Sequence, residues 1–221
     1  METLLKASNV KKKYGEYEAL RGVDFSILQA EQVAIQGASG SGKSTLLYLL
    51  GGLDIPSFGD IYWKSKKLSD FADSDLARYR NEQIGFVFQS HFLLSSISCL
   101  QNILLPGRIG GANVQEVEER IRPLAKYLGV EQCLPKFPHQ ISGGEQQRIN
   151  ILRAISLHPS ILLCDEPTGN LDSKNSGKVI ELLRELSLKF KASLIVVTHD
   201  NSIASQFSKK HFMSDGKIIE Q

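Results

Sequence analysis

Hydrophobic residues along the chain follow two spacings, one typical of buried strands and one typical of helices. Short, largely apolar runs occupy residues 32–36, 84–88, 161–165 and 193–198. Helical stretches at 45–50 and 174–190 follow two of these runs. Strand–helix–strand alternation of this kind predicts a parallel sheet with helices on both faces.

The N-terminal part has a different pattern. Two β-prone runs, Leu4–Val10 and Gly22–Leu28, are separated by a turn predicted at Tyr14-Gly15. Turn residues at 56–60 lead into a short strand at 61–63, and residues 74–81 suit a short helix. These segments predict a β-rich region that begins before the glycine-rich stretch at 37–44.

Residues 90–158 are helical in pattern. Apolar positions recur at helical spacing through Val114, Val117, Ile121, Leu124 and Leu128, and residues 144–156 suit a further helix. We therefore expect a helical subdomain at 90–158, inserted in a single domain. Residues 1–89 and 159–221 would form the core of that domain.

Composition and charge exclude several classes of protein. Of the 221 residues, 42% are hydrophobic and 23% are charged, which fits a packed globular chain. The net charge of +2, from 26 basic and 24 acidic residues, gives no overall field for binding nucleic acid. The lysine runs at 11–13 and 209–210 are expected to be solvated surface.

The cysteines and the apolar runs indicate the compartment. Cys99, Cys133 and Cys164 are far apart and lack C-x-x-C spacing, so neither a disulfide framework nor a zinc site is indicated. Reduced, cytosolic thiols are expected. No apolar run approaches the roughly 20 residues that span a bilayer, so any membrane link is expected to come through a partner.

A glycine-rich loop follows the strand predicted at 32–36. Residues 37–44 read Gly-Ala-Ser-Gly-Ser-Gly-Lys-Ser and fit the phosphate-binding pattern G-x-x-x-x-G-K-[ST]. Glycines let successive N–H groups point at phosphate oxygens, and the next helix adds unpaired N–H groups. The alternative, an ordinary Gly/Ser-rich turn, is disfavoured by the Lys-Ser pair and by the flanking strand and helix.

Specific roles follow from this pattern. We expect Lys43 to reach the β- and γ-phosphates and the Ser44 hydroxyl to contact Mg²⁺. The candidate nucleotide-binding residues of the loop are Gly37, Ala38, Ser39, Gly40, Ser41, Gly42, Lys43, Ser44 and Thr45.

Two adjacent carboxylates end the strand predicted at 161–165. Ligands of open α/β sheets bind at the carboxyl ends of strands, so Asp165 suits a role at Mg²⁺. Glu166, one residue on, could orient or deprotonate an attacking water. Two acids at a strand end could instead cap a helix, but the phosphate loop makes this alternative weak.

The order and spacing of these motifs resemble those of an ABC-type ATPase over essentially the whole chain. The resemblance rests on residues 37–44, Gln89, the Ile-Ser-Gly-Gly-Glu segment at 141–145, residues 161–166, Asn-Leu-Asp at 170–172, and His199. It implies a P-loop NTPase fold of the ABC class, α/β, with a mixed sheet core, an N-terminal antiparallel β-subdomain and the helical insert.

The resemblance also implies a head-to-tail dimer with ATP and Mg²⁺ between the subunits. Ser142, Gly143 and Gly144 would contact the γ-phosphate of ATP held by the other subunit's loop. Glu145 and Ile141 depart from the usual Gln and Leu of this signature, and the charge of Glu145 makes its own contact with ATP less secure.

Four further residues receive roles by the same resemblance. Gln89 would contact Mg²⁺ or water, together with Ser44 and Asp165, and His199 would bridge the γ-phosphate and Glu166. The catalytic set is therefore Glu166, His199 and Gln89. Tyr14 would stack on adenine, unless it is an ordinary edge residue. Asp172 would link the two sites, unless it only caps the next helix.

The string Asp-Glu-Pro-Thr-Gly-Asn-Leu-Asp at 165–172 resembles the subgroup of lipoprotein-releasing, macrolide-exporter and cell-division ATPases. The segments at 50–54, 89–94 and 110–111 favour the lipoprotein-releasing type. The resemblance implies an integral membrane permease as partner and a place on the cytoplasmic face of the inner membrane. The alternatives are a macrolide-exporter ATPase and a division-associated regulator that transports nothing.

Two further classes are disfavoured. Soluble DNA-repair or translation ATPases of this fold are unlike the chain, because it has no second cassette and no long coiled-coil heptads. A simple P-loop kinase would leave the segment at 142–144 unexplained.

Overall fold

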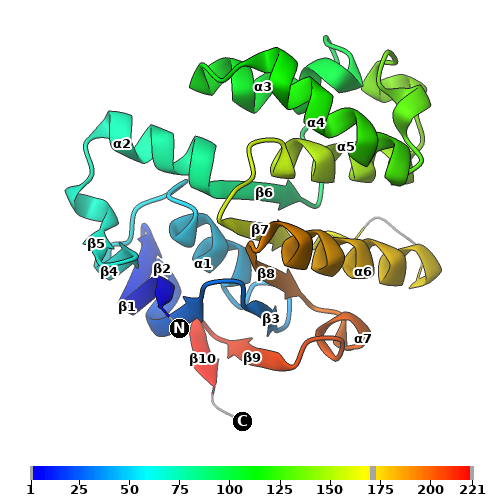
Figure 1. The fold of residues 1–221 in the computed structure, drawn as a ribbon. Helices are drawn as coiled ribbons and strands as arrows, with labels where there is room; N and C mark the ends of the chain where they lie inside the picture. The colour runs from blue at the N-terminus through cyan, green and yellow to red at the C-terminus, as the bar shows by residue number, and fades with distance from the viewer. Residues whose placement is uncertain (1, 170–172, 220–221) are drawn as a thin grey trace.

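The computed structural model describes residues 2–169 and 173–219. Two sheets and the helices that cover them form the body of the molecule (Figure 1). The first sheet is antiparallel with strand order β2-β1-β4-β5. Its strands are β1 (Thr3–Tyr14), β2 (Tyr17–Leu28), β4 (Phe58–Trp63) and β5 (Lys66–Lys67). The predicted turn lies between β1 and β2, where Gly15 has a φ of 61°.

The second sheet has the order β10-β9-β3-β8-β7-β6. Its strands are β3 (Gln32–Gln36), β6 (Ile84–Phe88), β7 (Ile161–Asp165), β8 (Ser193–Thr198), β9 (Lys209–Ser214) and β10 (Lys217–Ile219). Neighbouring strands from β9 to β6 pair in parallel, whereas β10 is antiparallel to β9. The sheet is therefore mixed, and the four apolar runs form β3, β6, β7 and β8, four of the strands that pair in parallel, as predicted.

Hydrophobic cores lie on both faces of this second sheet. Along β8, Leu194 and Val196 belong to one core, while Ile195 and Val197 belong to the other. The second of these cores includes helix α1 (Lys43–Leu50) and the first sheet. Alternate residues of a strand point to opposite faces, so a strand buried on both faces is apolar throughout.

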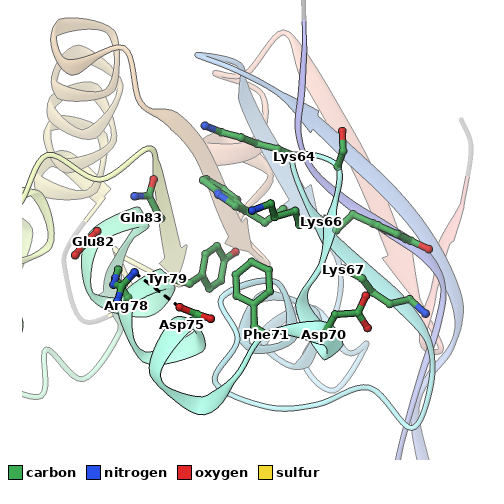
Figure 2. Close-up of a pocket in the computed structure, with 13 residues that line it drawn as sticks. Lys64, Lys66, Lys67, Asp70, Phe71, Asp75, Arg78, Tyr79, Glu82 and Gln83 are labelled. Carbon is green, nitrogen blue, oxygen red and sulfur yellow. Dashed lines mark ion pairs between the residues drawn. The ribbon is translucent and has the colours of Figure 1, made fainter.

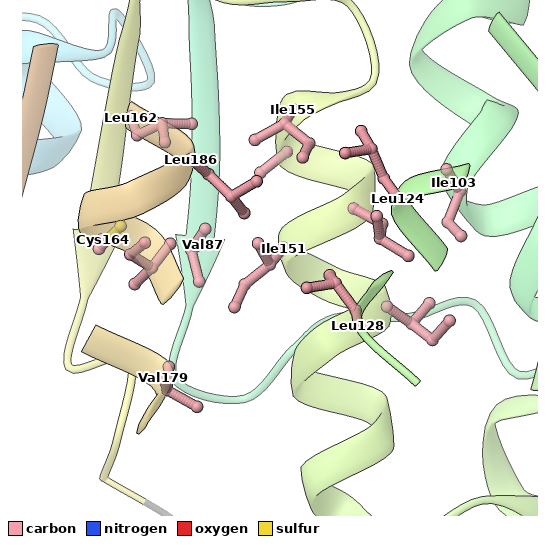
Figure 3. Close-up of a cluster of buried hydrophobic side chains, with 14 of the residues drawn as sticks. Val87, Ile103, Leu124, Leu128, Ile151, Ile155, Leu162, Cys164, Val179 and Leu186 are labelled. Carbon is pink, nitrogen blue, oxygen red and sulfur yellow. The ribbon is translucent and has the colours of Figure 1, made fainter. Parts of the chain in front are cut away.

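The remaining helices pack on the first of these cores. They are α3 (Cys99–Gly110), α4 (Val114–Tyr127), α5 (Gly143–Ile155), α6 (Ser173–Phe190) and α7 (Asn201–Ala204). Figure 3 shows this core as one cluster of side chains, which includes Ile103 of α3, Leu124 of α4, Ile151 of α5, Leu162 of β7 and Leu186 of α6. The predicted helical spacing of α4 is confirmed, because Val117, Ile121 and Leu124 are buried.

Helices α3, α4 and α5 lie between β6 and β7 in the chain and gather at one end of the molecule (Figure 1). The boundaries 89/90 and 158/159 stay a prediction. A short helix, α2 (Asp73–Arg78), continues into the π-helical turn η2 (Tyr79–Gln83) before β6. The 3₁₀ turns η1 (Leu68–Asp70), η3 (Glu131–Cys133) and η4 (Pro138–Gln140) complete the connections.

Among the described residues, no helix combines the length and the apolar character needed to cross a bilayer. All three cysteines are free and buried.

Candidate functional site

The glycine-rich loop connects β3 to α1 and fits closely against its surroundings. A Cβ atom at Gly37 would lie 2.1 Å from the carbonyl oxygen of Met213. Gly42 has a φ of 99°, and a Cβ there would lie 2.6 Å from the carbonyl oxygen of Ala19. Only glycine fits these two positions, because a side chain would clash and a positive φ would strain it. These two glycines therefore allow the loop to pass close to the backbone of Met213 and Ala19.

Lys43 begins α1 and extends back along this loop. Its Nζ donates hydrogen bonds to the carbonyl oxygens of Gly37 and Ala38, at 2.9 and 2.8 Å. The residue is buried, and this burial lowers the pKa of its ammonium group, although the charges of Glu166 and Asp165 oppose the shift. A buried cation whose hydrogen bonds go to two neutral carbonyls is well placed to bind an anion.

A cavity of about 580 Å³ opens beside the loop. Its size suits a ligand of a few hundred daltons. The candidate residues on its wall are Tyr14, Ala38, Ser39, Gly40, Gly42, Lys43, Ser44, Thr45, Gln89, Glu166 and His199. Gly37 and Ser41 are not part of the wall, and Ser41 is buried. Tyr17, which sequence reasoning did not select, also lines the cavity and is 59% exposed.

A larger cavity, about 760 Å³, lies between the β4–β5 turn and α2 (Figure 2). Its basic side chains include Lys67, which is 2.9 Å from Asp60, and Arg78, which is 3.8 Å from Asp75. The wall has no glycine-rich loop and no residue of the predicted site. Since two of its cations already have acidic partners, we assign the anion site to the smaller cavity.

Asp165 lies at the end of β7, next to α1. The Ser44 hydroxyl donates a hydrogen bond to its Oδ1 and the Tyr48 hydroxyl donates one to its Oδ2, each at 2.8 Å. Burial, and then the bond to Asp165, raises the pKa of Tyr48 well above its usual value, so Tyr48 stays a donor. Tyr48 was not predicted as a site residue, because in the sequence it is one apolar position of a helix.

Ser44 and Asp165 bring hard oxygen ligands together, as Mg²⁺ requires. No group of three or more His, Cys, Asp or Glu side chains that could hold a metal occurs among the described residues. Mg²⁺ usually binds through one or two protein oxygens together with substrate phosphates and waters. The donor set therefore fits Mg²⁺ that arrives with a nucleotide.

Glu166 has an unusual backbone conformation and contacts His199. Its φ is 44°, in the left-handed region, and its N–H donates to the carbonyl oxygen of Val197 at 3.1 Å. Its Oε1 lies 3.0 Å from His199 Nδ1. Non-glycine residues with positive φ are uncommon and often occur at functional sites. The conformation aims the carboxylate at the cavity that it lines.

Gln89 comes directly after β6 and also lines this cavity. A Cβ at Gly169 would lie 2.5 Å from its Nε2, so the side chain packs on the backbone of the loop that begins at Glu166. Glycine at position 169 allows this approach.

Tyr14 ends β1 and is held by two side chains. Its hydroxyl donates to Asp54 Oδ2 at 2.7 Å, and Lys12 Nζ lies 4.9 Å from its ring centroid. Lys12 in turn forms an ion pair with Asp54 at 2.6 Å, and its side chain is only 11% exposed. The expectation that the whole run at 11–13 is solvated is therefore wrong for Lys12, which positions Tyr14 at the cavity.

Ser142, Gly143 and Gly144 lie at the start of α5, where Ser142 and Gly143 are exposed and Gly144 is partly buried. They are not part of the cavity wall around Lys43. An added Cβ at Gly143 would meet nothing within 4 Å. This helix N-terminus therefore presents open N–H groups to solvent, in a place separate from the phosphate loop.

Side chains of α5 connect the signature to two loops of the cavity. Gln147 donates to the carbonyl oxygen of Pro167 at 2.7 Å, next to Glu166. Asn150 donates to the carbonyl oxygen of Phe88 at 3.1 Å. Arg153 donates to the carbonyl oxygens of His91 and Phe92, each at 2.6 Å. Sequence reasoning missed these residues, because buried polar positions inside a helix have no motif of their own.

The structure thus brings together most of the predicted residues on one cavity, and keeps residues 142–144 apart from them. Asp172 lies outside the described residues.

Comparisons with known proteins identify the family of the chain. The family model described as "ABC transporter" matches residues 20–169, more than half of the chain. The chain is 44% identical over 217 residues to the lipoprotein-releasing system ATP-binding protein LolD of Bdellovibrio bacteriovorus, covering 96% of this chain and 99% of that protein. It is 42% identical to the protein of the same name from Cytophaga hutchinsonii, covering 99% and 100%.

Among solved structures, a dimeric ATP-binding cassette in a post-hydrolysis state with ADP and phosphate superimposes with a TM-score of 0.87 and 37% identity. The match covers 98% of this chain and 97% of that one. The fold class and the ATPase activity expected from the sequence are thereby confirmed. The chain belongs to the ABC transporter family, as one of its ATP-binding, ATP-hydrolysing subunits.

Proposed function

We propose that this chain is the ATPase subunit of a membrane complex that releases lipoproteins from the inner membrane. The support for this cargo is the full-length similarity to two proteins named for lipoprotein release. The chain would work on the cytoplasmic face of that membrane, bound to an integral permease. A macrolide-exporter ATPase and a division-associated regulator remain the alternatives, since their predicted nucleotide sites are the same.

One observation carries the proposed mode of action: the two segments expected to bind phosphate do not share a cavity. The Lys43 loop lines one cavity, whereas the segment at 142–144 is not part of its wall. Two copies placed head to tail would set the signature of each against the phosphates bound by the other. A solved relative is a dimer. ATP would then be bound between subunits in two composite sites.

Each residue of the cavity has a proposed task in hydrolysis. The loop at 37–45 and Lys43 would hold the phosphates, and Tyr14 would hold the adenine. Ser44, Asp165 and Gln89 would hold Mg²⁺, which supplies charge neutralisation on the phosphates when bound. Glu166 would take a proton from the attacking water, while His199, 3.0 Å away, orients that carboxylate and contacts the γ-phosphate. Asp172 would connect the two sites.

A groove next to Gln89 suits the permease. It has a volume of about 260 Å³ and is bordered by Phe92, Ile109 and Leu157. Phe92 is 63% exposed and Ile109 is 73% exposed. Exposed apolar side chains around a groove are typical of a protein–protein contact. A permease segment seated there would contact the loop that Arg153 holds, three residues beyond Gln89.

Affinity purification of the Glu166→Gln chain from detergent-solubilised membranes, with ATP and Mg²⁺, tests the proposal. Glu166→Gln should slow hydrolysis and keep the dimer closed on its partner. We expect mass spectrometry to identify a permease together with a lipoprotein. A division protein in place of both would support the regulatory alternative. The absence of any membrane protein would contradict the proposal and both of its alternatives.

A further inference from the structure

The serine of the signature is bound by the unusual glutamate of the same motif. Ser142 donates both its backbone N–H and its hydroxyl proton to Glu145 Oε2, each at 2.8 Å. The N–H of Glu145 completes the capping box toward Ser142 Oγ, at 3.4 Å. The single proton of the Ser142 hydroxyl is therefore directed at a carboxylate of its own chain.

Glu145 is ionised and further anchored by Cys133. The hydrogen bond from the Ser142 backbone, followed by that from its side chain, lowers the pKa of Glu145 to about 2. The thiol of Cys133 lies 3.2 Å from Glu145 Oε1. Burial raises the pKa of Cys133 to about 11, so this thiol is protonated at neutral pH and donates to Oε1. The carboxylate thus has donors on both oxygens.

This arrangement conflicts with the task proposed for Ser142. A hydroxyl that donates to Glu145 presents lone pairs, not its proton, to an approaching phosphate. To donate to the γ-phosphate, Ser142 has to leave a charged acceptor, and charge-assisted hydrogen bonds are the stronger kind. The ionised carboxylate also repels the phosphate.

We propose that Glu145 is a positioning residue that restrains Ser142 and weakens the ATP-dependent pairing of two chains. Its function is to make the closed dimer less stable, so that the dimer reopens readily after hydrolysis. This inference rests on the composite-site dimer proposed above.

Glutamine at position 145 would keep the shape of the contact and remove its charge. An amide oxygen in the place of Oε2 can still accept both the N–H and the hydroxyl of Ser142, as in a capping box. The hydroxyl then donates to a neutral acceptor, so it leaves this acceptor for a phosphate more easily. The repulsion between the carboxylate and the phosphate is lost as well. Glu145→Gln is therefore the matched substitution for the proposed effect.

The test compares Glu166→Gln with the double variant Glu166→Gln/Glu145→Gln by sedimentation velocity with ATP and Mg²⁺. We expect about a tenfold gain at each composite site, the size of one hydrogen bond to a charged group, and about a hundredfold fall in the dimer dissociation constant. An unchanged or higher constant overturns the inference. Glu119→Gln, at an exposed position on α4, controls for the loss of one negative charge and should leave the constant unchanged.

A double-mutant cycle shows whether the effect passes through the hydroxyl. With Ser142→Ala in both chains, Glu145→Gln should strengthen pairing less, through the lost charge alone, and an undiminished gain overturns the route through Ser142. A thermal melt of Glu145→Gln should match the parent, because the cap is retained. If the Glu166→Gln chain itself fails to pair with ATP, the proposed dimer is wrong. If it pairs and Glu145→Gln has no effect, only the present inference fails.

Discussion

The hydroxyl of Tyr48 lies 2.8 Å from Oδ2 of Asp165, and the hydroxyl of Ser44 lies at the same distance from Oδ1. Two donors from one face of α1 therefore fix both oxygens of the carboxylate. A ligand of Mg²⁺ must present its oxygens in a defined direction, and hydrogen bonds from neighbouring groups commonly provide this orientation.

Tyr48→Phe should reduce the affinity for Mg²⁺ with ATP several-fold and lower the free energy of unfolding by about 1–2 kcal/mol, since one oxygen of a buried carboxylate loses its donor. Titration of Mg²⁺ against a bound fluorescent ATP analogue and urea denaturation measure the two effects. Tyr62→Phe, on β4, is the control, and equal effects of both substitutions would contradict the assignment.

Glu166→Gln should preserve ATP binding and lower the ATPase rate at least about a hundredfold, the contribution typical of a general base. His199→Ala should also lower the rate, because the carboxylate loses the neighbour that orients it. Phosphate release under saturating ATP measures both. Glu181→Gln, exposed on α6, controls for the change of charge. Hydrolysis at the parental rate by Glu166→Gln would remove this residue from the mechanism.

Arg153→Lys should loosen the loop at 89–94. Two consecutive residues there, His91 and Phe92, have φ values of 58° and 48°, and Arg153 bonds both carbonyl oxygens. Lysine lacks the planar guanidinium, whose Nη1 and Nη2 bond these two carbonyls separately, so the strained conformation loses part of its support. We expect faster amide hydrogen exchange at 89–94 with ATP affinity unchanged. Arg122→Lys, on the exposed side of α4, should not alter the exchange there.

The stability of the fold should fall in mild acid, in part through His211. Burial, and then the charge of Lys209, lowers the pKa of His211 below 6.5, although Glu31 opposes the shift. Its buried Nε2 has no hydrogen-bond partner among the described residues. Below pH 6.5 the unfolded chain binds the extra proton more readily than the folded one, so the free energy of unfolding decreases as the pH falls.

His211→Phe should make this pH dependence shallower while keeping the edge contact with Phe25, whose ring centroid is 5.4 Å away. Denaturation series between pH 5 and 8 (about the range in which histidine titrates) measure the slope. Burial also lowers the pKa values of His91 and His158, so part of the slope should remain. A slope identical to the parent's would show that His211 does not contribute.

The sequence predicted the strands best where both faces of the sheet are covered. The strands at 32–36 and 161–165 occur as expected, because a run that is apolar apart from its ends fits a covered parallel strand. Strands β9 and β10 were not predicted. They contain Lys209, Lys210, His211 and Lys217, and pairing with β3 and with each other, not an apolar pattern, makes them strands.

The sequence predicted the site residues that belong to a recognisable motif. The phosphate loop, Asp165 and Glu166 have fixed spacing, because each lies at the end of a parallel strand. Tyr48, Gln147 and Arg153 could not be found in the same way. Their contacts are to residues 20 to 117 positions away, and such distances become short only once the helices have packed. The partly buried state of Lys12 depends likewise on Asp54, 42 residues on.

In the proposed dimer, helix α5 would connect two active sites. Its first turn would lie on the partner's nucleotide, while Gln147 holds the backbone beside Glu166 of its own subunit. Loss of the γ-phosphate from one site would thus release the Gln147 hydrogen bond that supports the loop after Glu166 in the other site. The two sites of a dimer would then act cooperatively, so the rate of hydrolysis should rise more steeply than a hyperbola with ATP concentration. A subunit with a disabled site should lower the turnover of the intact subunit that is paired with it.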